Sequence, residues 1–404
     1  MRMPGRLMAA SALALLIAGG AHAQGISNGA VKIGVLGDMS GVFQDLSGAS
    51  SVAAAKMAVD DFIKNEKPSF KIELVTSDHQ NKPDIAVSRV REWYDVDGVD
   101  MVTDAINSAV ALAVSGVTRE KNRVLMVTGA GTTALINEQC SPNTILYAWD
   151  TYGISNALAG SITRSGKQNW YFLSVDYALG QAIEKDATRS IEAAGGKVVG
   201  SRKHPTGTAD FSSFVLTAQN SGADVIGLAN AGGDLINSVK AAQDFGITQK
   251  QTIAPMAATL MDIHAIGLAS SQGLMLVEGF YWDRNDESRA WSERFFKERN
   301  RMPIMLQAGL YSAITTYLKA VKETGTDDAK TVLDHMKKTE INDLFAKGGR
   351  IRADGRMVYD MYVLAVKKPA ASKRAWDYLE IRDAISGSDA YQPLSDSRCP
   401  LVKN

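Results

Sequence analysis

The stretches "VKIGVLG" (31–37), "SSVAAAKMAVDDFIKNE" (50–66) and "KIELVTSD" (71–78) decide the fold. The first and third have the composition of strands, whereas the second spaces its apolar residues for one face of a helix. A strand, a helix and a second strand in that order are typical of a βαβ unit. The sequence therefore predicts a parallel sheet that is covered by helices on both faces.

The alternation of strand and helix continues to residue 128. Strands are predicted at 99–104 and 123–128, and helices at 83–95 and 108–121. The pattern restarts after "YAWDTYG" (147–153), with strands at 169–176, 197–203, 223–230 and 251–256 and helices at 178–194, 210–221 and 233–245. The fold class is therefore α/β, with two doubly wound parallel sheets in succession.

A third section begins with an apolar run at 273–282. Three helices are predicted after it, near 287–300, 305–323 and 327–339. Residues 350–368 are expected to form a β-hairpin through Asp354-Gly355, and the tail beyond them to be irregular. No long flexible linker interrupts the chain, so we expect two packed lobes with several crossings between them.

The N-terminus has the pattern of an export signal. Arg2 and Arg6 precede an apolar run at 7–18, and Ala21-His22-Ala23 forms an A-x-A cleavage site. The alternative is a membrane anchor, but the run is shorter than the roughly 20 residues that a spanning helix needs. Residues 1–23 are therefore predicted to be a signal peptide cleaved near Ala23-Gln24, which leaves a soluble exported protein.

The charge balance limits the expected binding partners, and the cysteine content indicates a disulfide. The chain has 44 basic and 44 acidic side chains, so neither nucleic acid nor an anionic membrane is an expected partner. Cys140 and Cys399 are the two cysteines, and an even pair in an exported protein favours a disulfide over two free thiols. No Cys-x-x-Cys exists and the histidines are scattered, so no metal site is expected.

The stretch "VTGAGTTALI" (127–136) resembles a phosphate loop, but nucleotide chemistry does not fit it. It lacks the lysine of a Walker A loop, and "GVLGDMSG" (34–41) lacks the spacing of a dinucleotide fingerprint. A G-x-S-x-G nucleophile elbow is also absent. We therefore expect a binding protein without a cofactor rather than an enzyme.

Three loops of the first lobe follow strand ends and should meet at a ligand crevice: 38–48, 105–108 and 128–133. Ser108 and Thr132 each stand where a helix would begin, so their hydroxyls and nearby backbone N–H groups can hold a carboxylate. Gly129 and Gly131 would let the backbone approach the ligand closely. The alternative is that Ser108 and Thr132 are ordinary helix caps.

Several segments resemble the branched-chain amino-acid (Leu/Ile/Val-binding) type of periplasmic substrate-binding protein, which serves ABC importers. They are "VKIGVLGDMSGVF…AAKMAVDDF", "SAVALAV…RVLMVTGAGTTAL", "DYALGQAIEKDA" and "AAQDFGI", and the likeness covers nearly the whole mature chain. The resemblance implies the type I periplasmic-binding fold, in which a three-segment hinge joins the lobes. It places 24–148 and 280–345 in lobe I, and 149–279 and 346–404 in lobe II.

The resemblance also implies site residues. The ligand carboxylate would be held in lobe I by Ser108 and by the turn at Ala130, Gly131 and Thr132. Across the cleft, the resemblance implies contacts from the crossing and from lobe II: Asp150, Tyr152, Tyr177, Asn230 and Ala231.

One departure from the family bears on the ligand. Amino-acid binders place a glutamate after the next strand for the ligand ammonium, where this chain has Met256 and Ala257. A buried ammonium without that partner would cost several kcal/mol. Phe43, Tyr152, Tyr177, Met256 and Tyr281 are the expected walls of the pocket. With the missing acid, these walls indicate a benzoate- or cinnamate-like ligand, and "WDTY" and "FYWDRN" resemble the aromatic-acid branch.

Two alternatives stay open. Asp150 could replace the missing glutamate, which would make the ligand a branched-chain or other amino acid. The protein could also present its ligand to a sensor rather than to a transporter. The expected partners are a small carboxylate and the permease subunits of an importer, and the expected state is a periplasmic monomer.

Overall fold

The computed structural model describes residues 25–402, and the predicted signal peptide lies outside them. Sheet A is fully parallel in the order β2-β1-β3-β4-β5. Its strands are β1 (Ala30–Gly37), β2 (Lys71–Asp78), β3 (Met101–Asp104), β4 (Val124–Val127) and β5 (Thr144–Leu146). The buried apolar side chains of β1 alternate between two clusters, because successive side chains of a strand point to opposite faces.

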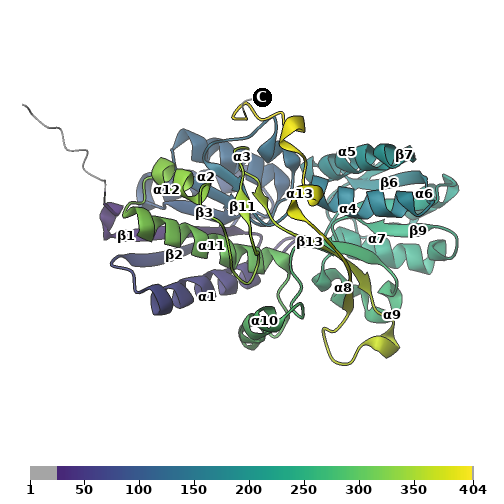
Figure 1. Cartoon of the computed structure of the whole chain (residues 1–404). Helices are drawn as coiled ribbons and strands as arrows, with labels where there is room; N and C mark the ends of the chain where they lie inside the picture. The colour runs from purple at the N-terminus through teal and green to yellow at the C-terminus, as the bar shows by residue number, and fades with distance from the viewer. Residues whose placement is uncertain (1–24, 403–404) are drawn as a thin grey trace, which may run out of the picture.

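Helices cover both faces of sheet A. On one face α1 (Gly48–Glu66) packs against α11 (Met305–Thr324), and on the other α2 (Pro83–Glu92) packs against α3 (Ser108–Glu120). Helix α2 continues as a single π-turn over Trp93–Asp97. The first lobe therefore borrows helix α11 from the third section of the chain, as Figure 1 shows on its left side.

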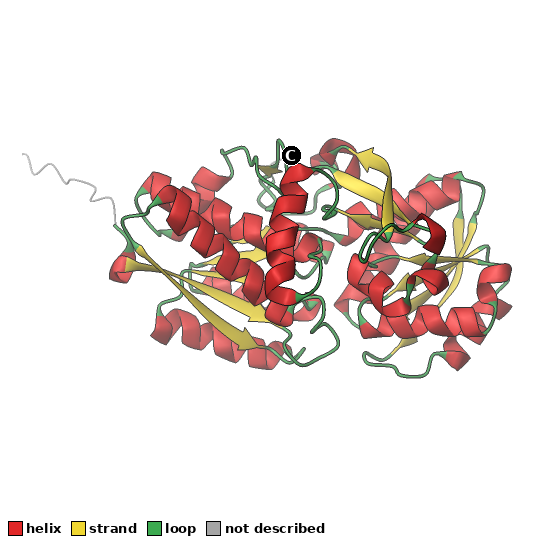
Figure 2. Cartoon of the chain, turned by 90° about the horizontal axis from the view of Figure 1, so that it is seen from below, coloured by secondary structure: helices red, strands yellow, loops and turns green. Residues whose placement is uncertain are grey.

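Sheet B repeats the plan in the second lobe, with the parallel order β7-β6-β8-β9. Its strands are β6 (Asn169–Val175), β7 (Lys197–His204), β8 (Val225–Ala229) and β9 (Thr252–Pro255). The helices of this part are α4 (Thr151–Arg164), α5 (Ala178–Ala193), α6 (Ser212–Asn220), α7 (Gly233–Asp244), α8 (Leu260–Ile266) and α9 (Leu268–Ser271). The predicted pair of α/β lobes is therefore confirmed (Figures 1 and 2).

The third section departs from the prediction in two places. The hairpin is limited to β11 (Arg350–Ile351) and β12 (Met357–Val358), whereas β13 (Met361–Val366) pairs with β10 (Met275–Glu278) and β14 (Leu379–Ile385). Strand β14 lies in the tail that was predicted to be irregular, and most of its side chains are exposed. The other elements are α10 (Asp286–Arg299), α12 (Ala329–Met336), α13 (Gly387–Ala390) and the short helical turns Ser27–Gly29, Thr133–Ile136, Ile247–Gln249, Pro369–Ala371 and Leu394–Asp396.

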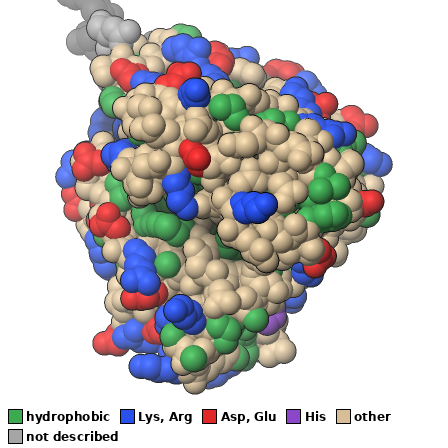
Figure 3. All heavy atoms as spheres, turned by 90° about the vertical axis from the view of Figure 1, so that its right-hand side faces the viewer, with side chains coloured by type: hydrophobic (Ala, Val, Ile, Leu, Met, Phe, Trp, Pro, Cys, Tyr) green, Lys and Arg blue, Asp and Glu red, His purple; other side chains and the backbone are tan. Residues whose placement is uncertain are grey.

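The residue boundaries of the two lobes stay a prediction. The contacts of residues 350–385 show which lobe each part of this segment lies against. The hairpin lies against the first lobe, because the Leu146 N–H donates to the Gly355 carbonyl at 3.0 Å. The chain then crosses to sheet C (β10, β13 and β14) beside the second lobe. At the end of the molecule that the second lobe forms, acidic and basic side chains are interspersed (Figure 3).

The predicted disulfide is confirmed between Cys140 and Cys399, whose Cα atoms are 5.6 Å apart. The tail reaches it from the second lobe, where the Asn156 amide donates to the Asp389 carbonyl at 2.8 Å. The bridge spans 259 residues of chain, and the loss of unfolded-state entropy that such a loop implies is roughly 5 kcal/mol. The tail is therefore fastened to both lobes.

A buried ion pair joins two of the crossings. Arg356, just after the hairpin turn, and Asp150, just before α4, are both fully buried, with Nε and Oδ2 2.6 Å apart. The Arg356 Nη1 also donates to the carbonyls of Leu146 and Tyr147, at 2.6 and 2.9 Å. Asp150 accepts the Gly153 N–H at 2.6 Å and so caps α4. The pair therefore holds the segment between β5 and α4, where the chain first passes between the lobes, against the hairpin segment near Arg356, where it passes between them again.

Replacing Arg356 by methionine is expected to lower the free energy of unfolding by about 3–5 kcal/mol, because it leaves the Asp150 carboxylate buried without a counter-charge. Urea unfolding followed by circular dichroism measures the loss. Arg382→Met is the control, since Arg382 lies on the exposed β14 and pairs only with Glu380 at the surface. A loss below about 1 kcal/mol for Arg356→Met would contradict this role of the ion pair.

Candidate ligand-binding site

The carboxyl ends of both sheets face one another across the cleft. In an open α/β sheet, ligands bind outside these ends where the strand order reverses. The order reverses between β1 and β3 in sheet A and between β6 and β8 in sheet B. The loops that follow β1, β3, β6 and β8 carry Phe43, Ser108, Tyr177, and Asn230 with Ala231, respectively. The turn Ala130-Gly131-Thr132 and Met256 follow the neighbouring strands β4 and β9.

Ser108 is the first residue of α3 rather than its cap. Asn107 occupies the cap position, and its Oδ1 accepts the N–H groups of Ala109 and Val110 at 2.8 and 3.1 Å. The Ser108 hydroxyl is left buried and has no hydrogen-bond partner within residues 25–402. Buried polar groups in proteins nearly always have a hydrogen-bond partner, so this free hydroxyl beside the positive end of α3 marks a candidate position for a ligand oxygen.

The turn Ala130-Gly131-Thr132 supplies further donors. Its three backbone N–H groups donate to no acceptor within the described part of the chain. Thr132 caps the short helical turn after it by accepting the Ala134 N–H at 3.4 Å, a long hydrogen bond. The turn lies below the ring of Trp149, so close that a Cβ on Gly131 would come within 2.6 Å of the indole.

The loop after β1, residues 38–47, lies beside the cavity between the lobes. Buried Asp38 shapes it by accepting the N–H groups of Gly41 and Phe43, at 2.7 and 3.0 Å. The Ser47 hydroxyl donates to Asp104 at 2.6 Å, which ties the loop to the end of β3. Burial raises the pKa of Asp104 to about 6. Phe43 itself is 3% exposed and points its ring into the space between the lobes.

The second lobe contributes Tyr177 and Asn230. His204 Nδ1 faces the Pro205 carbonyl and must donate to it, so its Nε2 accepts from the Asn230 amide at 3.1 Å. The Asn230 Oδ1 and the Tyr177 hydroxyl are then left buried without a partner among the described residues. Burial and the nearby Asp234 raise the pKa of Tyr177 above its usual range, so the phenol stays protonated.

The lobes are closed on each other. Gly232 has a φ of +59°, and a Cβ there would lie 2.7 Å from the carbonyl oxygen of Val42 in the opposite lobe. The Thr133 hydroxyl of the first lobe donates to Asp186 of α5 at 2.9 Å, and Thr151 donates to the same oxygen at 2.6 Å. Only a glycine at position 232 allows its backbone to approach the Val42 carbonyl so closely.

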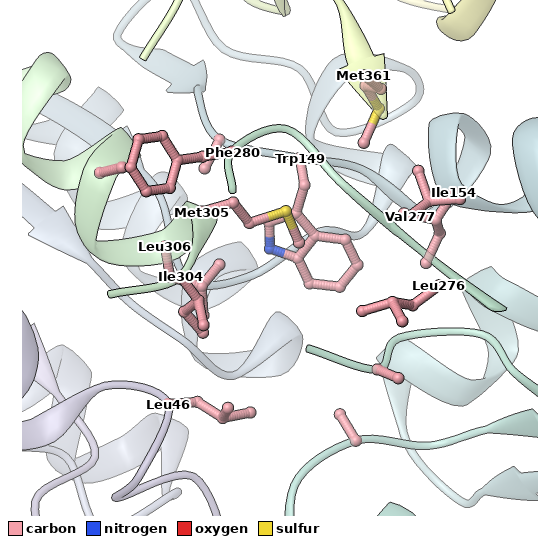
Figure 4. Packing of buried hydrophobic residues seen from close by; sticks show 14 of the residues in the cluster. Leu46, Trp149, Ile154, Leu276, Val277, Phe280, Ile304, Met305, Leu306 and Met361 are labelled. Atoms are coloured by element: carbon pink, nitrogen blue, oxygen red, sulfur yellow. The ribbon is translucent and has the colours of Figure 1, made fainter. Parts of the chain in front are cut away.

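An apolar cavity remains between the lobes. It has a volume of about 20 Å³, which is room for about one water molecule. Apart from Gly129 and Thr259, its lining is apolar: Phe43, Leu46, Ile106, Trp149, Ile154, Leu179, Ala231, Ala257, Ala258, Val277, Met305 and Leu306. Figure 4 shows Trp149 at the centre of this packing. No charged side chain of the described residues lines the cavity.

The predicted residues divide into groups. Phe43 and Ala231 line the cavity, and Ser108, Ala130, Gly131, Thr132 and Met256 belong to loops whose neighbours Ile106, Gly129 and Ala257 line it. Tyr152 instead lies under the Arg189 guanidinium, 5.6 Å from its ring centre, and is not among the lining residues. Asp150 is taken up by Arg356, so it has no free charge for a ligand ammonium.

Comparison with known proteins agrees with this architecture. A family model described as periplasmic binding protein matches residues 30–373. The chain belongs to the periplasmic binding protein family.

Two solved structures are similar to this binding protein over nearly its whole length. A periplasmic binding protein from Burkholderia mallei is 45% identical, with a TM-score of 0.91 over 93% of this chain and 100% of that one. A branched chain amino acid ABC transporter periplasmic ligand-binding protein from Burkholderia xenovorans is 36% identical, with a TM-score of 0.83 over 92% and 100%. The type I periplasmic-binding fold is therefore confirmed, and these neighbours are solute-binding proteins rather than enzymes.

More distant relatives fit the same family. Leu/Ile/Val-binding protein homolog 6 of Brucella melitensis is 26% identical over 319 residues, which are 75% of this chain and 79% of the relative. A solute-binding protein from R. palustris in complex with benzoate is 17% identical, with a TM-score of 0.75 over 89% and 97%, and that likeness concerns the fold alone. In residues 25–402 no helix is long and apolar enough to cross a membrane, and no group of three or more His, Cys, Asp or Glu could hold a metal ion.

Sequence reasoning missed the residue at the centre of the cleft. Trp149 lies in the crossing between the lobes, and its indole N–H donates to the Gly129 carbonyl at 3.0 Å. The segment "WDTY" predicts Asp150 and Tyr152 at the ligand, whereas the tryptophan before them lines the cavity. An aromatic residue at the first crossing, placed next to a glycine turn, was the available signal.

Glu278 is a second residue that the sequence did not single out. It ends β10, is 1% exposed and accepts backbone N–H groups from both lobes: Leu260 at 2.9 Å and Met305 at 3.2 Å. Burial, reinforced by the neighbouring Asp262, raises its pKa from an ordinary 4.5 to about 8 despite these two donors. Glu278 therefore ties the start of α8 to the start of α11 as a neutral or weakly ionised acid.

The raised pKa of Glu278 predicts a pH dependence of stability. Between about pH 4.5 and pH 8 the folded state holds a proton that the unfolded state has lost, so this group's contribution falls as pH rises through the window. Glu278→Gln should remove this slope, which unfolding in urea at a series of pH values measures. Glu293→Gln, at an exposed position of α10, is the control. Parallel curves for Glu278→Gln and the unmodified protein would contradict the shift.

Proposed function

We propose that this protein captures a small aromatic acid, benzoate- or cinnamate-like, in the periplasm and delivers it to the permease subunits of an ABC importer. The observation that carries the proposal is an apolar cavity with no charged lining residue, placed beside a turn with free backbone donors. Such a site fits a ligand with a flat apolar body and one anionic end.

The anionic end is assigned to the first lobe. The Ser108 hydroxyl and the N–H groups of Ala130, Gly131 and Thr132 can donate to a carboxylate, and the start of α3 adds its positive end. A hydrogen bond to a charged group contributes about 1.5–3 kcal/mol. Several of them, with the burial of a ring, are enough for a micromolar affinity, which corresponds to about −8 kcal/mol.

Capture requires movement of the lobes. The cavity of about 20 Å³ is far too small for an aromatic acid, so the lobes open before the ligand enters and close around it afterwards. The contacts between Val42 and Gly232 and between Thr133 and Asp186 are among those that must break on opening. We propose hinge closure of this kind, near 148–150, 278–281 and 340–350, as the state that the importer recognises.

A branched-chain amino acid is the alternative ligand. The 36%-identical Burkholderia xenovorans protein is described as a branched chain amino acid transporter component, which favours it. Against it, no acidic side chain of the described residues lines the cavity, and Met256 stands where the resemblance places a glutamate. Both oxygens of the nearby Glu278 already accept backbone N–H groups. An ammonium would therefore be desolvated without a partner.

Other parts of the proposal concern the partners. A sensor role would use the same cleft and closure, with a membrane receptor in place of the permease. Co-purification with the membrane proteins encoded beside this chain distinguishes the two roles. We propose transport and a monomeric state, with Tyr177, Asn230 and Ala231 of the second lobe around the ligand. The resemblance also implies Asp150 and Tyr152, but Asp150 pairs with Arg356 and Tyr152 lies under Arg189, so we do not place these two at the ligand.

A thermal-shift panel tests the ligand class. Benzoate, 4-hydroxybenzoate and cinnamate are expected to raise the midpoint of unfolding, because a ligand that binds only the folded state stabilises it by mass action. Cyclohexanecarboxamide, which has a ring but no carboxylate, should have no effect. Stabilisation by leucine or valine together with silence from the aromatic acids would overturn the proposed class.

The double variant Ser108→Ala with Thr132→Ala tests the docking turn. It is expected to weaken binding of the best acid at least about tenfold in isothermal titration, because it removes the Ser108 and Thr132 hydroxyls as charge-assisted donors to the carboxylate and leaves the backbone N–H groups in place. Ser292→Ala is the matched control, because Ser292 is also buried without a partner among the described residues but lies in α10, outside the cavity lining. Unchanged affinity in a folded double variant would exclude this docking mode.

A further inference from the structure

Trp149 is held in place from several directions. Its indole N–H donates to the Gly129 carbonyl at 3.0 Å, and its ring covers Gly131. The residues on either side of it are tied as well: the Ala148 carbonyl accepts the Tyr359 hydroxyl, and Asp150 pairs with Arg356. The ring therefore cannot swing away without disturbing the crossing.

The same side chain meets both lobes. Figure 4 shows Trp149 with Met305 beside it, Leu306 of the first lobe on one side, and Ile154 and Val277 of the second lobe on the other, while Leu46 lies farther off in the same cluster. These residues line the cavity together with the indole. Trp149 thus occupies the middle of the cleft, directly beside the turn with the free donors.

The Trp149 N–H also orients that turn. In a trans peptide the carbonyl and the following N–H point in opposite directions. By holding the Gly129 carbonyl, the indole fixes the direction of the Ala130 N–H, which is one of the donors without an acceptor in the described chain. The tryptophan therefore acts on the docking turn as well as on the space next to it.

We propose that Trp149 determines the size selectivity of the site: its fixed ring is the wall against which the ligand body packs, and its bulk limits the ligand to one ring. This inference rests on the proposed capture of a small carboxylate in the cleft. Neighbours such as Met305 can adapt to a ligand because methionine is flexible, whereas the anchored indole cannot. The ligand must therefore fit the space that Trp149 leaves.

Isothermal titration with benzoate and naphthoate tests the inference. The unmodified protein is expected to bind benzoate at least about tenfold more tightly than naphthoate. Trp149→Ala should lower this ratio at least about tenfold, because it opens space for a second ring and removes packing against the first. Trp149→Phe should lower the ratio as well, but by less. This smaller change serves as the test if the alanine variant fails to fold.

Trp291→Phe is the matched control. Trp291 is another buried tryptophan, packed against Phe280, Phe295 and Tyr311 away from the cavity lining, so its loss should leave the ratio unchanged. Intrinsic fluorescence gives a second readout. Benzoate should change the emission of the unmodified protein and of Trp291→Phe, and this change should be lost in Trp149→Phe even where binding persists.

The outcomes separate this inference from the proposed function. If Trp149→Phe binds benzoate with an unchanged ratio and an unchanged fluorescence response, the inference is wrong and the proposed function stands. If the unmodified protein binds amino acids instead, the proposed ligand class is wrong, and the ratio is then measured with valine and phenylalanine. An unchanged ratio for that pair in Trp149→Ala and Trp149→Phe would overturn the inference in the same way.

Discussion

The buried pair of Arg356 and Asp150 is the interaction on which the rest of the cleft depends. Two charges without solvent exposure are costly unless they compensate each other, and here the compensation comes from residues about two hundred positions apart in the chain. The arginine holds the end of β5 through the carbonyls of Leu146 and Tyr147, and the aspartate starts α4. Trp149 lies between these two fixed points.

The crossing in turn holds the docking turn, Ala130-Gly131-Thr132, in place. The Thr151 N–H donates to the Gly131 carbonyl at 2.8 Å, and the Trp149 indole holds the Gly129 carbonyl. Both bonds leave the N–H groups of the turn free for a ligand. Closure of the lobes then adds Tyr177 and Asn230, whose buried polar atoms have no partner of their own within residues 25–402. In the proposed function, the rigid crossing and the preoriented turn hold the acid, and the second lobe closes over them.

Much of this could be predicted from the sequence, and the exceptions have physical reasons. The strands and helices of both lobes follow from apolar periodicity, because each buries one face or both. Strand β5 was missed because it is three residues long. Strand β14 was missed because its apolar alternation covers only Leu379 to Arg382 and most of its side chains are exposed. Asn107, rather than Ser108, caps α3, since adjacent residues can compete for that position. The pairing of Asp150 with Arg356 and the position of Trp149 in the cleft depend on contacts with residues distant in the chain, and these contacts cannot be inferred from a single sequence.

We propose above all that an acid docks by its carboxylate on the turn beside Trp149. A crystal structure of the protein with the acid that stabilises it most tests this directly. The carboxylate is expected within hydrogen-bonding distance of the Ser108 hydroxyl and of backbone N–H groups in Ala130-Gly131-Thr132, with the ring against Trp149. A ligand bound elsewhere, or bound in the cleft with its carboxylate directed away from this turn, would contradict it.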